Sequence, residues 1–198
     1  ELNSSQGWTI YRRSVLFLLI AALNQIEKNA EVIAKFTVNK GLYCEIKIPN
    51  HTIDASFIQE IDRQMRKMIA LNLPIVKHYI PRQDAIDLFQ KLGREGKVNL
   101  LSALSKPLIS IYTCAEYSDY LYGPMLYETK ELGLFELDCE PDGVLIRTPD
   151  EMTNGQIESE SASTSPNLAR SSRNRKRGQI SWRAALFPIS IVSTRKIQ

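Results

Sequence analysis

Apolar residues recur at helical spacing in three segments of the chain. Residues Ile10 to Lys28 are dominated by straight-chain and aliphatic side chains, which indicates a helix packed on a sheet. A second helix has apolar positions on one face and charged residues on the others, and Asp54 or Ser56 is placed to cap its first turn. A third helix ends at Gly93. The apolar positions of the second helix are Phe57, Ile61, Met65, Met68 and Leu71, and those of the third are Ala85, Ile86, Leu88, Phe89 and Leu92.

Short runs rich in β-branched and aromatic residues lie between these helices and predict strands. The first two are joined by Asn39-Lys40-Gly41, where Asn and Gly supply the positive φ that a tight hairpin needs. Helices and hairpins in irregular order predict an α+β fold, with an antiparallel sheet packed against long helices. The expected strands are Val32–Val38, Leu42–Ile48, Ile75–Ile80, Leu108–Cys114, Leu132–Cys139 and Val144–Arg147.

The character of the sequence changes after residue 150, which divides the chain into a domain (1–150) and a C-terminal tail (151–198). Glu151 to Ser172 is rich in Ser, Glu, Asn and Thr, and we expect disorder there because little can be buried. Arg173 to Arg177 is a basic cluster. The apolar residues between Trp182 and Val192 either dock on the domain or begin a further element.

Charge is distributed unevenly along the 198 residues. Eight of the 25 Lys and Arg residues lie from Arg170 onward, which leaves 17 basic against 22 acidic residues before that point. Nucleic-acid affinity comes largely from cationic contacts to phosphate, so the acidic domain is not expected to bind nucleic acid. Weak binding is expected only through the tail.

Side chains that carry catalysis are scarce. His51 and His78 are the only histidines and have no partner at metal-ligand spacing. Cys44, Cys114 and Cys139 are odd in number and lie in apolar contexts, as expected for reduced, buried thiols of a cytoplasmic protein. The longest apolar run, from Val15 to Leu23, is about half of what a bilayer requires, so no membrane segment is expected.

One Gly-Lys segment has a superficial likeness to a phosphate-binding loop. Gly93-Arg-Glu-Gly-Lys-Val98 lacks both the spacing of a P-loop and the hydroxyl that holds Mg²⁺, and it follows a helix instead of a strand. Phosphoryl transfer by this chain alone is therefore not expected.

Three segments nevertheless occur in the order and approximate spacing of a known module: Gly41-Leu-Tyr-Cys-Glu-Ile46, Gly93 to Val98, and Tyr117-Ser-Asp-Tyr-Leu-Tyr-Gly-Pro-Met125. Residues 11 to 150 resemble the second additional domain of threonyl-tRNA synthetases. That domain is also found in alanyl-tRNA synthetases and in bacterial uridine-kinase-related nucleoside kinases. The resemblance implies the same fold.

The resemblance also implies that the hydrolytic centre is lost. The synthetases edit mischarged tRNA with a His-x-x-x-His pair together with a Cys and a His four residues apart, and the matching positions here are Phe17, Ala21, Leu121 and Met125. Lys97, Asp119 and Tyr43 match positions near the editing pocket, and Tyr122 is a fourth candidate pocket residue. These residues either form a structural ion pair of Lys97 with Asp119, floored by Tyr43 and Phe17, or line a residual ligand pocket.

Gly41 to Ile46 and Leu134 to Pro149 are more similar to the nucleoside-kinase branch of this group. The expected function is therefore that of a non-catalytic N-terminal portion that positions or regulates a neighbouring kinase domain, which is its expected partner. No cofactor or metal is expected in this chain, while ATP and Mg²⁺ belong to the missing kinase domain. The alternatives are a trans-editing hydrolase of aminoacyl-tRNA and a small-molecule binding module. A cytoplasmic location is expected, and a homo-oligomer remains open.

Overall fold

The computed structural model describes residues 4–38, 40–49, 51–149 and 157. The described residues fall into two compact units, one from residues 4–79 and 110–157 and the other from residues 80–109. The expectations for the tail, including the basic cluster from Arg173 to Arg177, lie outside the described residues.

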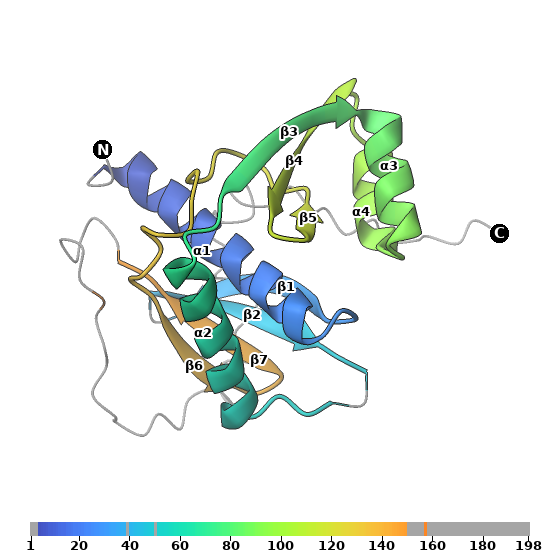
Figure 1. Ribbon diagram of the computed structural model, residues 1–198. Helices are drawn as coiled ribbons and strands as arrows, with labels where there is room; N and C mark the ends of the chain where they lie inside the picture. Colours follow the sequence, from blue (N-terminus) through green and yellow to red (C-terminus); the bar gives the residue numbers. More distant parts are fainter. Residues whose placement is uncertain (1–3, 39, 50, 150–156, 158–198) are drawn as a thin grey trace. The chain divides into compact units, whose positions relative to one another are not determined.

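The first unit begins with the long helix α1 (Ser5–Ile26), whose central turns are fully buried (Figure 1). It starts five residues before the expected Ile10, because the Ser4 hydroxyl oxygen accepts a hydrogen bond from the Gly7 N–H at 3.0 Å and caps the first turn. Ser14 lies in its middle and accepts the N–H of Leu126 at 2.9 Å. This bond ties a distant loop to the helix.

Helix α2 (Ala55–Ala70) confirms the amphipathic pattern, with Phe57, Ile61, Met65 and Met68 buried. The carboxylate of Asp54 accepts the Phe57 N–H at 2.8 Å, so Asp54 is the capping residue of the two that were expected. The prediction for Leu71 was wrong. Leu71 ends the helix and is 61% exposed, because the chain turns away there instead of continuing the apolar face.

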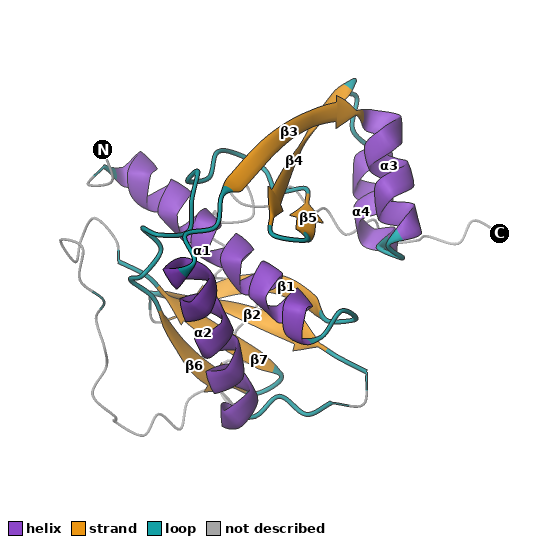
Figure 2. Cartoon of the chain, in the orientation of Figure 1, coloured by secondary structure: helices purple, strands orange, loops and turns teal. Residues whose placement is uncertain are grey.

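The main sheet has four antiparallel strands in the order β1-β2-β7-β6 and bears out the expected α+β fold. Its strands are β1 (Glu31–Val38), β2 (Gly41–Lys47), β6 (Glu136–Glu140) and β7 (Gly143–Arg147). Helices α1 and α2 lie over the same face of this sheet (Figure 2). Cys44 and Ile46 of β2 are buried beneath them, in the alternation typical of a sheet with one covered face.

Two local details of the sheet differ from expectation. In the β1–β2 turn the positive φ, 59°, belongs to Lys40 and not to Gly41, while Asn39 lies outside the described residues. The strand expected from Leu132 begins only at Glu136. Leu132 is fully buried in a loop, because the next residues are held by side chains of the helices.

A glycine is required where β7 begins. A Cβ atom on Gly143 would lie 2.1 Å from the carbonyl oxygen of Cys44, well inside van der Waals contact. The close approach of these two strands therefore depends on the missing side chain.

A second sheet has the order β3-β4-β5, formed by β3 (Ile75–Pro81), β4 (Leu108–Cys114) and β5 (Tyr117–Asp119). Strand β5 was not expected from the sequence, since three residues are too few for an alternating pattern. The tight turn before it depends on Ala115, which has a φ of 51°.

The second unit contains helices α3 (Arg82–Lys91) and α4 (Glu95–Ser102), which pack on one another. Gly93 ends α3 as expected, with a φ of 67°. Helix α4 was missed because its glycine and charged residues were interpreted as a loop. Ala85 and Phe89 of α3 and Leu101 of α4 are buried.

None of the helices that the structure describes combines the length and the apolar character needed to cross a membrane.

Candidate functional site

The four positions that the resemblance matches to an editing centre are occupied by buried apolar side chains. Phe17 and Ala21 lie one turn apart on α1 and have no exposed surface, and Leu121 and Met125 follow β5 with 2% and 6% exposed. The Phe17 ring centroid lies 5.8 Å from that of Tyr117 of β5. These positions are therefore part of the hydrophobic core.

Asp119 is a buried carboxylate whose two oxygens are both bound locally. One oxygen accepts the hydroxyl of Tyr117 at 2.8 Å and the other accepts the N–H of Tyr120 at 2.7 Å. These donors stabilise the charge in a site where only 3% of the residue is exposed. Lys97 lies half-exposed on α4 of the second unit. Its pairing with Asp119 stays a prediction.

The two tyrosines expected at the pocket have different surroundings. Tyr43 of β2 donates to the carbonyl of Pro141 at 2.8 Å, and its ring centroid lies 5.2 Å from that of Phe36. Burial, with smaller contributions from acidic neighbours that include Glu45, raises the pKa of Tyr43. Tyr122 is 47% exposed. A role for either tyrosine in ligand binding stays a prediction.

Arg13 of α1 is a buried cation that the sequence pattern did not single out. It precedes Phe17 by one helical turn, is 5% exposed, and donates to the Pro124 carbonyl at 2.8 Å. Burial lowers the pKa of Arg13. Gly123, with a φ of 90°, gives the guanidinium room, and its carbonyl accepts the Tyr112 hydroxyl at 2.7 Å. The sequence signal that could have identified Arg13 is an arginine on an otherwise apolar helical face.

The cysteines do not form a nucleophilic site. Burial raises the pKa of Cys44 to about 12 and that of Cys114 to about 11, which keeps both as neutral thiols. The expectation that all three cysteines are buried was wrong for Cys139, which is exposed because it lies on the edge strand β6.

Among the described residues, the two histidines also lack the neighbours that a catalytic site requires. The His51 ring packs at 4.6 Å on that of Phe57, and His78 is exposed on β3. Over the described ranges of the chain, no three His, Cys, Asp or Glu side chains converge as metal ligands. The residues Phe17, Ala21, Leu121 and Met125 do not fit a metal ion, since apolar side chains offer no hard or borderline donor atoms.

A depression of about 320 Å³ lies elsewhere, between α2 and β6 of the first unit. Ile58 and Leu137 contribute its apolar part, and Gln59, Asp62 and Arg63 of α2 contribute its polar part. It is a shallow surface site outside the lost editing centre.

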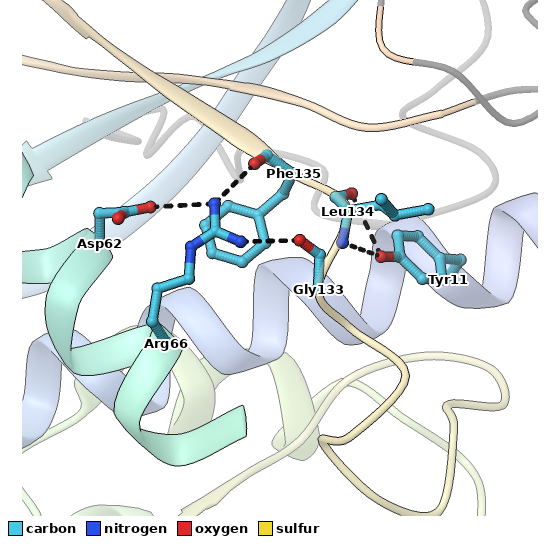
Figure 3. Close-up of polar contacts among 6 residues, drawn as sticks. All are labelled: Tyr11, Asp62, Arg66, Gly133, Leu134 and Phe135. Carbon is cyan, nitrogen blue, oxygen red and sulfur yellow. Dashed lines mark hydrogen bonds and ion pairs between the residues drawn. The ribbon is translucent and has the colours of Figure 1, made fainter. Parts of the chain in front are cut away.

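Arg66 fixes α2 to the segment that leads into β6 (Figure 3). Its guanidinium donates to the carbonyls of Gly133 at 2.7 Å and Phe135 at 3.0 Å, and lies 4.0 Å from the centroid of the Phe135 ring. Asp62, one turn earlier, approaches the same guanidinium at 3.4 Å. The hydroxyl of Tyr11 on α1 both donates to and accepts from the backbone of Leu134. The start of β6 is therefore held by both helices.

No family model matches the chain. The chain is 30% identical over 137 residues to a threonine–tRNA ligase from Syntrophotalea carbinolica, a match that covers 69% of this chain and 22% of that protein. It is 29% identical over 137 residues to a threonine–tRNA ligase from Acidithiobacillus ferrooxidans (68% and 21% covered), and 26% identical over 138 residues to one from Aquifex aeolicus (68% and 22% covered).

The chain thus spans about a fifth of the length of the curated relatives it matches. Together with the mixed α+β fold, this similarity supports a threonyl-tRNA synthetase-like domain of the editing or accessory type.

Proposed function

We propose that this domain is a non-catalytic accessory domain, derived from an editing domain whose hydrolytic centre has been replaced by hydrophobic core. The observation that carries the proposal is the burial of Phe17, Ala21, Leu121 and Met125. Hydrolysis of an ester needs a general base or an activated water. Apolar side chains at these positions supply neither.

The parent protein that we propose is a uridine-kinase-related nucleoside kinase, in which this domain positions or regulates the kinase domain. The segments Gly41 to Ile46 and Leu134 to Pro149 support this parent by their likeness to that branch. ATP and Mg²⁺ would then bind to the kinase domain and not to this chain.

A second candidate is an accessory domain of a threonyl-tRNA synthetase-like parent. The identity of 26–30% to threonine–tRNA ligases favours it. The complete reading frame separates the two parents. A P-loop followed by the Ser or Thr that holds Mg²⁺ supports the kinase, and an aminoacylation domain overturns that parent while leaving the accessory role intact.

The loss of catalysis is tested by deacylation. We expect the protein to release serine from seryl-tRNA no faster than buffer alone, with base hydrolysis as the control that defines complete release. Turnover above the buffer rate would contradict the non-catalytic role and restore the trans-editing alternative. Titration of the protein with ATP should show no binding, and saturable binding would contradict the absence of a nucleotide site in this chain.

A further inference from the structure

Strand β6 lies at one edge of the four-stranded sheet. Its only partner among the described strands is β7, with Glu136 opposite Arg147 and Glu140 opposite Gly143. In an antiparallel ladder, alternate residues of an edge strand direct their backbone N–H and C=O groups away from the partner strand. Such an edge is a template for one more strand.

The edge runs beside helix α2, and the two elements contact one another. The depression of about 320 Å³ between them is lined on the strand side by Leu137 and on the helix side by Ile58, Gln59, Asp62 and Arg63. A strand added to β6 would lie along this depression. Main-chain bonds to an edge strand supply affinity in such complexes, while pockets for alternate side chains supply specificity.

The two faces of β6 differ in chemistry. Leu137 lies with α2 at the depression, and the exposed Cys139 shares its face by alternation. Glu136, Asp138 and Glu140 lie on the opposite face, where Asp138 already forms an ion pair with Arg147. An added strand therefore meets, on one face, a depression whose apolar part is formed by Leu137 and Ile58, and carboxylates on the other face.

The depression and the outer edge of β6 together form a groove, the β6–α2 groove. The structure holds this groove in place without a ligand. Arg66 of α2 donates to the backbone at Gly133 and Phe135, immediately before β6 (Figure 3). These bonds fix the spacing between the helix and the start of the edge strand. Little ordering of the groove is needed on binding, which favours affinity.

We infer that the β6–α2 groove binds an extended segment of a partner protein by strand addition, and that this segment alternates apolar residues with Lys or Arg. An apolar side chain enters the depression at Leu137, and the basic side chains face Glu136 and Glu140. The inference goes beyond the accessory role and holds for either parent protein.

The probe is a synthetic peptide, acetyl-Ser-Lys-Val-Arg-Val-Lys-Ser-amide, and the controls are a version with Glu in place of Lys and Arg and a version with the same residues in scrambled order. Binding to the full chain is measured by fluorescence anisotropy, and amide hydrogen exchange reports on β6. We expect saturable binding of the basic alternating peptide, at least about fivefold tighter than that of either control. We also expect protection of alternate β6 amides.

Two variants locate the site. Glu140→Lys should weaken binding by about fivefold or more, since an attraction between the half-buried Glu140 and a basic side chain of the peptide becomes a repulsion, whereas the surface change Glu116→Lys should not. Gln59→Trp fills the depression from an exposed position and should weaken binding by about tenfold or more, whereas Gln90→Trp on α3 should not.

Several results would overturn the inference. One is that the acidic peptide binds as tightly as the basic peptide. Another is that the control variants weaken binding as much as the site variants do. A third is that the basic peptide binds without protecting the β6 amides from exchange. Protection of β6 amides before peptide is added would also overturn it. If that protection rises with protein concentration, the occupant is a second copy, and if it does not, the chain covers its own edge.

Discussion

Gly123→Ala is predicted to destabilise the first unit strongly. The residue has a φ of 90°, which an L-amino acid adopts only at a cost of about 1–2 kcal/mol. The added Cβ would lie 2.7 Å from the Cζ atom of Arg13. The guanidinium is buried and donates to the Pro124 carbonyl, so displacing it removes a charge-assisted hydrogen bond of about 1.5–3 kcal/mol.

Adding the two effects gives a loss of about 2.5–5 kcal/mol, a large share of the roughly 5–15 kcal/mol by which domains are usually stable. Urea unfolding followed by circular dichroism and tryptophan fluorescence measures it. Gly133→Ala is the matched control in the same unit. Its added Cβ meets no atom within 4 Å and its φ is not positive, so a change of at most about 0.5 kcal/mol is expected.

A second measurement separates the two effects. In an Arg13→Met background the guanidinium is gone, and Gly123→Ala should cost only the backbone strain of about 1–2 kcal/mol. A loss below about 1 kcal/mol in the original background would refute the reasoning. The same cost with and without the guanidinium would show that Arg13 does not hold the Gly123-Pro124 turn.

Tyr11→Phe should cost about 1–3 kcal/mol in urea unfolding, because the backbone of Leu134 loses both a donor and an acceptor at 3.1 and 2.8 Å. Burial raises the pKa of Tyr11 to about 12, so the native state favours the protonated phenol. The free energy of unfolding should therefore fall as pH rises from about 10, the unfolded value, to about 12. The fall should be smaller in Tyr11→Phe. Hydrogen bonds, above all from the Phe57 N–H, lower the pKa of Asp54. The contribution of Asp54 to the free energy of unfolding is therefore complete above its unfolded pKa of about 3.9, and it is lost as pH falls through the lower native pKa. Asp54→Asn should reduce the difference in unfolding midpoint between neutral and acidic solution, and an unchanged difference would contradict the capping role. A thiol reagent should modify Cys139 rapidly and the other two cysteines only on unfolding; fast reaction of all three in native protein would contradict their burial.

Several elements followed directly from the sequence. The period of Phe57, Ile61 and Met65 predicted α2, because this pattern depends on neighbours within a few residues. The sequence also offered Asp54 or Ser56 as the cap, and the structure shows that it is Asp54. The end of α3 at Gly93 followed in the same way from the preference of glycine for positive φ.

Other elements depended on distant parts of the chain. The three residues of β5 are a strand only because β4 pairs with them, with Tyr112 opposite Asp119. The strand expected from Leu132 starts later because Tyr11 and Arg66 bind the backbone before it. No local pattern contains those contacts.

The sequence by itself determined that apolar side chains, Phe17, Ala21, Leu121 and Met125, stand at the positions that the resemblance matches to an editing centre, because residue identity does not depend on the fold. Only the tertiary structure decided that these positions are core, since burial depends on which elements pack together. It also decided that β6 is an edge strand beside α2, because strand order is set by pairing between segments far apart in the sequence.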